Sequence, residues 1–308
     1  MTPTLVTFPG GSLVERATVR SATLRPSPDT GATTGAGPST GPDAAPGGRE
    51  DRLLVVTDRT PFHPVDPGWP DQGPDRGILA HGDRRAPVLD CVIGATDGHA
   101  LFVGSEIPVR RGEPGWSFVV VHVLAAATLE VVAGDEVTLT VDAGHRAALS
   151  AGHTGCHLAA LALNAALAGR WRKTPRPDGL GRPDFDGTAI VTSRIEPFGS
   201  VDEYRLGRSL RRSGFDPAGL ADELPAVAAA VDATLAGWVA AGGAVRVETA
   251  GPALTDRREW VCELPDGIAR IPCGGTHVTA LADLGSVRVT LDLAADGQQL
   301  TMRTTVGR

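Results

Sequence analysis

The sequence lacks the features that mark membrane, secreted and disulfide-rich proteins. No run approaches the ~20 apolar residues of a transmembrane helix, so no membrane partner is expected. The first residues have neither the basic segment nor the apolar core of a secretory signal, which predicts a cytoplasmic location. Four irregularly spaced cysteines give no disulfide framework, in agreement with a reducing compartment: Cys91, Cys156, Cys262 and Cys273.

Signatures of nucleotide chemistry are also missing. The chain has no Gly-x4-Gly-Lys phosphate loop and no dinucleotide fingerprint, so we expect no nucleotide cofactor and no dependence on ATP. A net charge of −7 opposes nonspecific attraction to nucleic acid. Basic residues still gather in two segments, which predict a phosphate-contacting rim around a polynucleotide end, although solvated surface loops have the same composition. These residues are Arg170, Arg172, Lys173, Arg176 and Arg182, then Arg205, Arg208, Arg211 and Arg212.

The length of 308 residues predicts two domains, at 1–143 and 144–308. In the first, residues 12–24 alternate apolar and polar side chains as a strand does. Residues 25–50 are rich in Pro, Gly, Ser and Thr and predict a disordered insertion. Further strands are expected at 52–57, 87–93, 99–104, 117–123, 128–132 and 136–141, with a turn-rich loop at 60–77. Short strands at this spacing favour an all-β domain, either a closed barrel or a sandwich.

The second domain is expected to be α+β. Residues 146–168 have helical periodicity, with Gly169 as terminator, and a second helix is predicted at 217–241, with Pro225 restarting it and Gly242-Gly243 closing it. Strands are predicted at 188–195, 200–206, 244–249 and 257–263, followed by a hairpin of 285–293 with 298–305.

Two short segments carry candidate metal ligands. His153 and His157 are four residues apart, so a helix places both imidazoles on one face. Cys273 and His277 follow far downstream in a Gly-rich turn, where bare backbone can approach an ion closely. Either pair alone is more typical of ordinary residues than of a metal site. Together they offer three nitrogens and one thiolate, a donor set that suits Zn²⁺ better than Mg²⁺ or Ca²⁺.

These segments carry a resemblance to a known family. His153-Thr-Gly-Cys-His157 and Pro272-Cys273-Gly-Gly-Thr-His277-Val278 resemble the two signature motifs of the alanyl-tRNA synthetase editing domain and of its free-standing AlaX-type relatives. Threonyl-tRNA synthetase carries a related domain. Residues 134–142 are similar to the barrel strand that leads into the motif helix in those proteins, and the resemblance covers about residues 52–308. It departs from the family at 66–73, where relatives often have Gly-Gly-Gly-Gln-Pro, and at Cys156, where they commonly have Gln or Thr.

The resemblance implies a hydrolase that acts in trans for translation fidelity. It would bind misacylated tRNA and release serine or glycine from tRNA specific for alanine, with one Zn²⁺ per chain. The metal ligands and catalytic residues implied are His153, His157, Cys273 and His277. The residues implied or expected to contact substrate are Thr154, Cys156, Gly274, Gly275 and Thr276, and those expected to contact RNA are Arg170, Arg172, Lys173 and Arg176.

Other functions remain open at this stage. The departures from the family favour a different misacylated tRNA, one carrying threonine or an unusual amino acid. Four protein ligands would close a tetrahedral zinc site, which favours a noncatalytic RNA-binding module with structural zinc. The same side chains can also position water without metal, as the threonyl relatives are thought to do. Nothing in the sequence indicates an oligomeric state.

Overall fold

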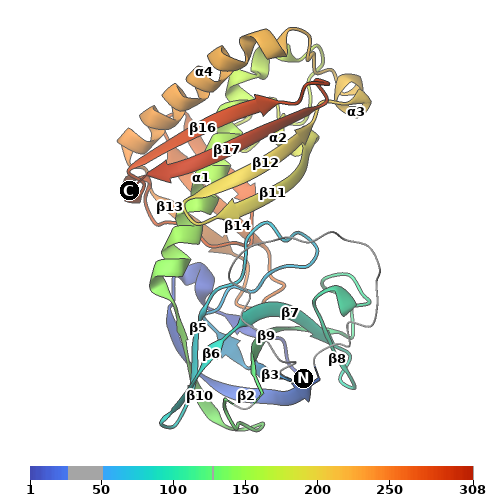
Figure 1. Ribbon diagram of the computed structural model, residues 1–308, viewed down its shortest axis with the longest axis vertical. Coiled ribbons are helices and arrows are strands. Elements are labelled where there is room, and N and C mark those ends of the chain that lie inside the picture. Colours follow the sequence, from blue (N-terminus) through green and yellow to red (C-terminus); the bar gives the residue numbers. More distant parts are fainter. Residues whose placement is uncertain (27–50, 127, 308) are drawn as a thin grey trace.

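A computed structural model describes residues 1–26, 51–126 and 128–307, so most of the predicted insertion at 25–50 lies outside the described residues. Figure 1 shows two lobes joined by a long helix, with the N-terminal lobe below and the C-terminal lobe above. The fold combines a curled sheet with a mixed helical and sheet lobe.

The N-terminal lobe is built on an eight-stranded sheet in the order β6-β5-β10-β2-β3-β9-β7-β8, with every neighbouring pair antiparallel. The strands are β2 Val14–Arg25, β3 Arg52–Thr57, β5 Gly77–His81, β6 Arg84–Val88, β7 Asp90–Thr96, β8 Leu101–Val103, β9 Ser117–Ala125 and β10 Glu136–Val141. A short parallel pair, β1 Leu5–Val6 and β4 Arg59–Thr60, and the 3-10 turns Phe8–Gly10 and Gly104–Glu106 complete the lobe.

The closed barrel expected from the sequence is corrected by this topology. Within the described residues, the terminal strands β6 and β8 do not pair with each other, so the sheet curls without closing. The strand predicted at 87–93 is two strands that meet at Leu89, and 128–132 forms no strand. Strand β5 was missed because its alternation is weak. Apolar side chains still fill the concave face, among them Val55, Leu79, Val120 and Leu139.

Helix α1 (Ala143–Ala166) leaves the curled sheet and enters the C-terminal lobe. It begins three residues earlier than predicted because the Asp142 carboxylate accepts a hydrogen bond from the His145 N–H and caps the first turn. Its glycines permit close packing on the sheet of the upper lobe. A Cβ on Gly152 would lie 2.3 Å from the Glu196 carbonyl oxygen, and one on Gly155 would lie 2.7 Å from Val306 Cγ2. Gly169 lies in a 3-10 turn, Ala168–Arg170, and does not terminate the helix.

Two sheets and three more helices form the rest of the C-terminal lobe. A four-stranded sheet runs in the order β11-β12-β17-β16, and a three-stranded sheet in the order β13-β14-β15. The helices are α2 Asp186–Ala189, α3 Arg208–Arg212 and α4 Leu220–Ala241. The strands are β11 Ile190–Glu196, β12 Gly199–Arg205, β13 Val245–Thr249, β14 Arg258–Leu264, β15 Gly267–Pro272, β16 Ser286–Leu293 and β17 Gln299–Gly307, and a 3-10 turn lies at Leu281–Asp283.

Helix α4 corrects two expectations. Pro225 is the sixth residue of the helix and lies inside it, so it does not begin a new helix, whereas Gly242 ends the helix in the left-handed conformation as predicted. The second expectation was that no run approaches the length of a transmembrane helix, but the 22-residue α4 is long and apolar enough to cross a membrane by length and composition alone. The same test is passed by core helices, and Val231, Leu235 and Trp238 of α4 are buried in the main core of the lobe.

Candidate metal centre

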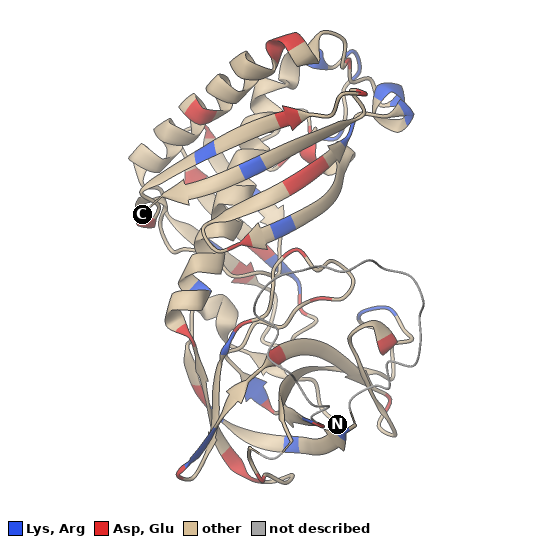
Figure 2. Ribbon diagram, viewed as in Figure 1, with Lys and Arg blue, Asp and Glu red and all other residues tan. Residues whose placement is uncertain are grey.

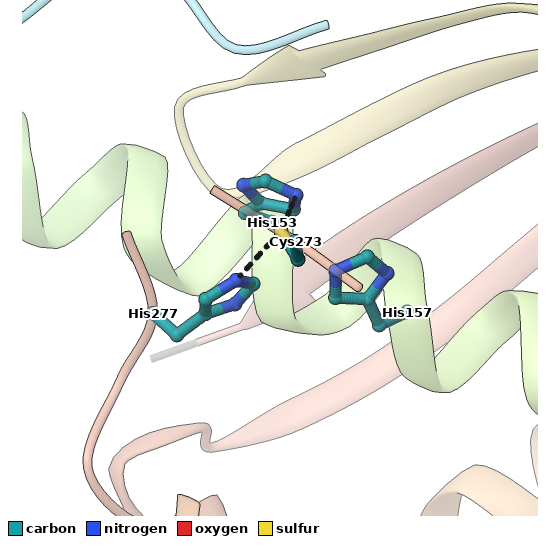
Figure 3. Close-up of side chains that lie close together, drawn as sticks. All are labelled: His153, His157, Cys273 and His277. Carbon is teal, nitrogen blue, oxygen red and sulfur yellow. Dashed lines mark hydrogen bonds between the residues drawn. The ribbon is translucent and has the colours of Figure 1, made fainter. Parts of the chain in front are cut away.

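Four side chains from two distant segments converge between the lobes. His153 and His157 come from α1, and Cys273 and His277 come from the loop that follows β15. One donor atom of each lies within 4.8 Å of the other three. Cys273 Sγ lies 3.4 Å from Nε2 of His153 and 3.4 Å from Nε2 of His277, the two contacts drawn in Figure 3. The predicted ligand set is thus brought together around one point.

The outer ring nitrogen of His153 is held by Gln72, which comes from the long loop of the N-terminal lobe. Gln72 Oε1 lies 2.7 Å from His153 Nδ1 and also accepts the Thr276 N–H, while Gln72 Nε2 donates to Thr276 Oγ1. The amide oxygen can only accept, so Nδ1 of His153 carries the proton. Nε2 is left with a free lone pair that faces Cys273.

Thr154 fixes the tautomer of His277 in the same way, by accepting a hydrogen bond from the ring. The Thr154 hydroxyl donates to the Ser150 carbonyl, so towards the Nδ1 of His277, 3.2 Å away, it can only accept. Nδ1 of His277 therefore bears the hydrogen, and Nε2 is free to bind a cation. The third ring, His157, packs against Trp260 with ring centroids 5.0 Å apart and an interplanar angle of 47°.

The third histidine provides the test of fit for a metal. His157 Nε2 is buried and finds no hydrogen-bond partner among residues 1–26, 51–126 and 128–307, an arrangement that is costly unless a cation or water satisfies the nitrogen. Three imidazole nitrogens and one sulfur that lie within 4.8 Å of one another match the donors and the number of a tetrahedral zinc site. These residues therefore fit one Zn²⁺.

Burial keeps the donors neutral in the absence of a cation. It lowers the pKa of His157 to about 4. It also lowers the pKa values of His153 and His277 well below their ordinary value, and the neighbouring imidazoles lower these two pKa values further. Burial also raises the pKa of the Cys273 thiol to about 12, partly offset by the N–H of Gly275. Neutral imidazoles are ready ligands, whereas the thiol must release its proton when a metal binds.

Two glycines beside Cys273 have different surroundings. A Cβ on Gly275 would lie 2.3 Å from His153 Cε1 and 2.6 Å from Gln72 Oε1, so only glycine fits there. A Cβ on Gly274 would meet no atom within 4 Å. Gly275 therefore permits the imidazole and the amide to pack against the backbone, while Gly274 faces open space.

A cavity of about 290 Å³ opens onto the cluster between the lobes. Cys273, His157 and both glycines line one end of it. The rest is lined by residues that include His63, Trp69, Asp71, Gln72, Arg111 and Arg258. A second cavity, of about 770 Å³, reaches Thr276 and His277 from another direction. The centre, in which His153 is buried and the other three residues are half-buried, thus lies beside space that a substrate can occupy.

Sequence reasoning did not place these barrel-lobe residues in the site. His63 stands in no pair at ligand spacing in the sequence, yet it lines the cavity. No group of the described residues bonds to its buried Nδ1, and burial lowers its pKa to about 4. Gln72 belongs to the run at 66–73 that departs from the family. The available signal for its role was that this run still contains a Gln, as the Gly-Gly-Gly-Gln-Pro run of the relatives does. Burial raises the pKa of Asp71 to about 6, with the N–H of Gln72 acting in the opposite direction.

The predicted substrate residues have mixed surroundings. Thr154 and Thr276 are buried and engaged with the ligand histidines and Gln72, as described above. Cys156 lies in a small separate cluster with Leu149 and Ile195, and its sulfur contacts the Asp202 carboxylate at 3.5 Å. Contact of these residues with substrate stays a prediction.

The predicted RNA-binding residues lie beyond the C-terminal end of α1. Figure 2 shows basic residues gathered at α3 and the adjacent loop, at the end of the lobe far from the N-terminal sheet. Arg170 pairs with Glu223, Arg172 with Asp216 and Arg176 with Asp184, while Lys173 donates to a backbone carbonyl. RNA contact through these residues stays a prediction.

Comparisons with known proteins agree with the motifs. No protein-family model matches the chain. An alanine–tRNA ligase of Frankia alni is 28% identical over 250 residues, covering 79% of this chain and 23% of the ligase. An alanine–tRNA ligase of Anaeromyxobacter dehalogenans is 29% identical over 260 residues, covering 81% of this chain and 23% of the ligase. The chain thus spans about a quarter of the length of the curated relatives it matches. These matches confirm the resemblance to alanyl-tRNA synthetases, and they cover about four-fifths of the chain.

Proposed function

We propose that this protein is a trans-acting aminoacyl-tRNA deacylase that binds one Zn²⁺ per chain and hydrolyses the ester of misacylated tRNA in the cytoplasm. The observation that carries the proposal is the cluster of three imidazoles and one thiol beside an interlobe cavity. The similarity to a segment of alanine–tRNA ligases supports tRNA for alanine as the nucleic-acid partner. Serine or glycine wrongly attached to that tRNA is the favoured substrate.

The residues of this chain divide the work between ligation and positioning. His153, His157, Cys273 and His277 would hold the metal. When bound there, Zn²⁺ supplies the Lewis acidity that polarises an ester carbonyl or lowers the pKa of a water toward ~7. Gln72 and Thr154 hold the protons of His153 and His277 on their outer nitrogens, which keeps the inner lone pairs aimed at the centre. Gly274 leaves its side of the cavity open for the ester.

A panel of mischarged tRNAs tests the proposal. Purified protein should contain about one zinc per chain, the number that a single four-donor site takes. It should release serine or glycine from tRNA for alanine faster than alanine from the same tRNA. Release of threonine from tRNAs mischarged with threonine, with no release of serine or glycine from alanine tRNA, would change the assigned substrate. His99→Ala, which removes an exposed histidine outside the cluster, serves as the control variant.

The four-donor set also favours a second candidate, a noncatalytic RNA-binding module with structural zinc. The two candidates differ in what Cys273→Ala does. For the deacylase we expect a protein that still melts cooperatively and has lost hydrolysis. For the structural module we expect unfolding without any activity to lose. A thermal melt measured beside the deacylation assay separates them.

A further inference from the structure

One carboxylate lies beside the candidate metal centre without belonging to it. Asp71 lines the same cavity as Cys273 and His157. Its Oδ2 lies 3.9 Å from Nε2 of His153, the nitrogen that also faces Cys273 Sγ. The four-donor group does not include Asp71. The carboxylate therefore adds negative charge next to the point where the ester of a substrate would react.

The loop holds this carboxylate in place. Asp71 Oδ1 accepts the N–H of Gln72 at 2.7 Å, and the Asp71 carbonyl accepts the N–H of Ile195 from β11 at 2.7 Å. Gln72 and Ile195 also form a parallel bridge. The loop of the N-terminal lobe is thus fastened to the C-terminal lobe at Asp71, and Oδ2 is directed toward the cluster.

No cation of the protein neutralises Asp71 in the part of the chain that the structure describes. The two arginines that share the cavity are occupied elsewhere. Arg111 pairs with Asp66 at 2.9 Å, and Arg258 donates to the carbonyls of Leu254 and Ala253. The cavity therefore offers an anionic position for a cationic group brought in by a ligand.

We propose that Asp71 binds the α-ammonium group of the aminoacyl ester and makes the enzyme selective for substrates with a free amine. This inference rests on the proposed deacylase function. In an aminoacyl ester the ammonium is attached one carbon from the ester carbonyl, so a carbonyl at the metal centre brings the ammonium close to the neighbouring carboxylate. Asp71 would act as a specificity residue in direct contact with the substrate.

The test compares aminoacyl-tRNA with its N-acetylated form, which lacks the positive charge. The intact protein should hydrolyse the free-amine substrate about tenfold faster or more in kcat/KM, the ratio expected for a hydrogen bond to a charged group. Asp71→Asn keeps the acceptor for Gln72 and should lower kcat/KM for the free-amine substrate alone, bringing the ratio near one. Asp83→Asn, which removes an exposed carboxylate that does not line the cavity, should keep the ratio of the unmodified protein.

Binding gives a readout that does not depend on turnover. A nonhydrolysable aminoacyl-adenosine amide with a free amine should bind more tightly than its N-acetylated form, and Asp71→Asn should remove the difference. Equal use of both substrates by the unmodified protein overturns the ammonium proposal and leaves deacylation standing. Loss of zinc from Asp71→Asn would overturn it in favour of a metal ligand. Failure of the unmodified protein both to hydrolyse and to bind any aminoacyl compound would overturn the proposed function as well.

Discussion

Single hydrogen bonds decide what the ligand histidines can do. The Gln72 amide and the Thr154 hydroxyl each act as acceptor for an outer imidazole nitrogen, so both inner nitrogens keep their lone pairs. Among the described residues no group bonds to Nε2 of His157, which therefore depends on a bound cation or water for satisfaction. The chemistry of the cluster therefore depends on residues that are not ligands.

Two adjacent glycines offer a matched pair of variants at this scale. Gly275→Ala places a methyl group against His153 and the Gln72 amide, so it should displace the imidazole and reduce both zinc content and deacylation by about tenfold or more, as second-shell losses do. Gly274→Ala adds the same methyl in open space and should keep zinc. Metal analysis and single-turnover hydrolysis measure the difference. Equal zinc loss in both variants would contradict the packing argument.

A buried histidine far from the cluster predicts a pH dependence of stability. His122 Nδ1 lies 3.1 Å from the Val55 carbonyl and Nε2 lies 2.8 Å from Thr60 Oγ1, and burial lowers its pKa from 6.5 to about 4. As the pH falls below 6.5 the unfolded chain takes up the proton first. The contribution of His122 is therefore complete above pH 6.5 and is lost between pH 6.5 and 4.

The variant His122→Leu removes that titration. Between pH 7.5 and 4 the free energy of unfolding of the unmodified protein should fall by about 3 kcal/mol more than that of the variant. Denaturant unfolding at several pH values measures both curves. Parallel curves would show that protonation of His122 does not contribute.

At the scale of elements, one side of α4 is buried in the core of the lobe and the other side is exposed to solvent. Leu235 is fully buried, whereas its neighbour Ala236 is exposed. If the apolar residues of this helix serve the core, Leu235→Ala should lower the free energy of unfolding by about 2–5 kcal/mol. Ala236→Ser should change it by less than about 0.5 kcal/mol. Chemical denaturation in solution tests this, and comparable small effects at both positions would contradict packing of α4 against the lobe.

Elements with strong local periodicity could be predicted from the sequence. The alternation at 12–24 became β2, and the Ala- and Leu-rich segment became α1. The hairpin predicted for 285–293 with 298–305 formed as β16 and β17, with Gly297 of its turn at φ 65°. Strand β15 and helix α3 were missed, since each is short and lacks a clear apolar period. Whether the curled sheet closes depends on pairing between distant strands, which periodicity does not encode.

The candidate site was predictable only in part, for the same reason. The four ligand residues stand in two recognisable short motifs. Their support comes from a third segment, because Gln72 reaches Thr276 across 204 positions of sequence. Asp71 and His63 lie in the same turn-rich loop, whose path depends on anchors in both lobes. Composition alone therefore indicated a loop but not its contacts.

At the scale of the whole molecule, a buried ion pair joins a loop of the N-terminal lobe to the helix that connects the two lobes. Asp75, from the loop that carries Asp71 and Gln72, pairs with Arg146 in the first turn of α1, and both side chains are almost fully buried. Arg146 also donates to the Pro61 carbonyl at 2.7 Å, and Asp75 accepts the N–H of His63 at 2.6 Å. The position of the loop over the cluster therefore depends on this pair.

Removing one partner should affect stability and the site together. Asp75→Asn leaves the Arg146 guanidinium buried without its counterion and should cost about 3–5 kcal/mol in the free energy of unfolding. The loop should loosen, so Gln72 would hold His153 less firmly and zinc affinity should fall. Asp75→Leu combined with Arg146→Met removes both charges and should recover much of the stability, because replacing a buried pair by apolar residues is often nearly neutral. Denaturant unfolding and zinc titration of the three proteins test this coupling. Full zinc affinity in a destabilised Asp75→Asn protein would show that the ion pair holds the loop against α1 without positioning the metal ligands.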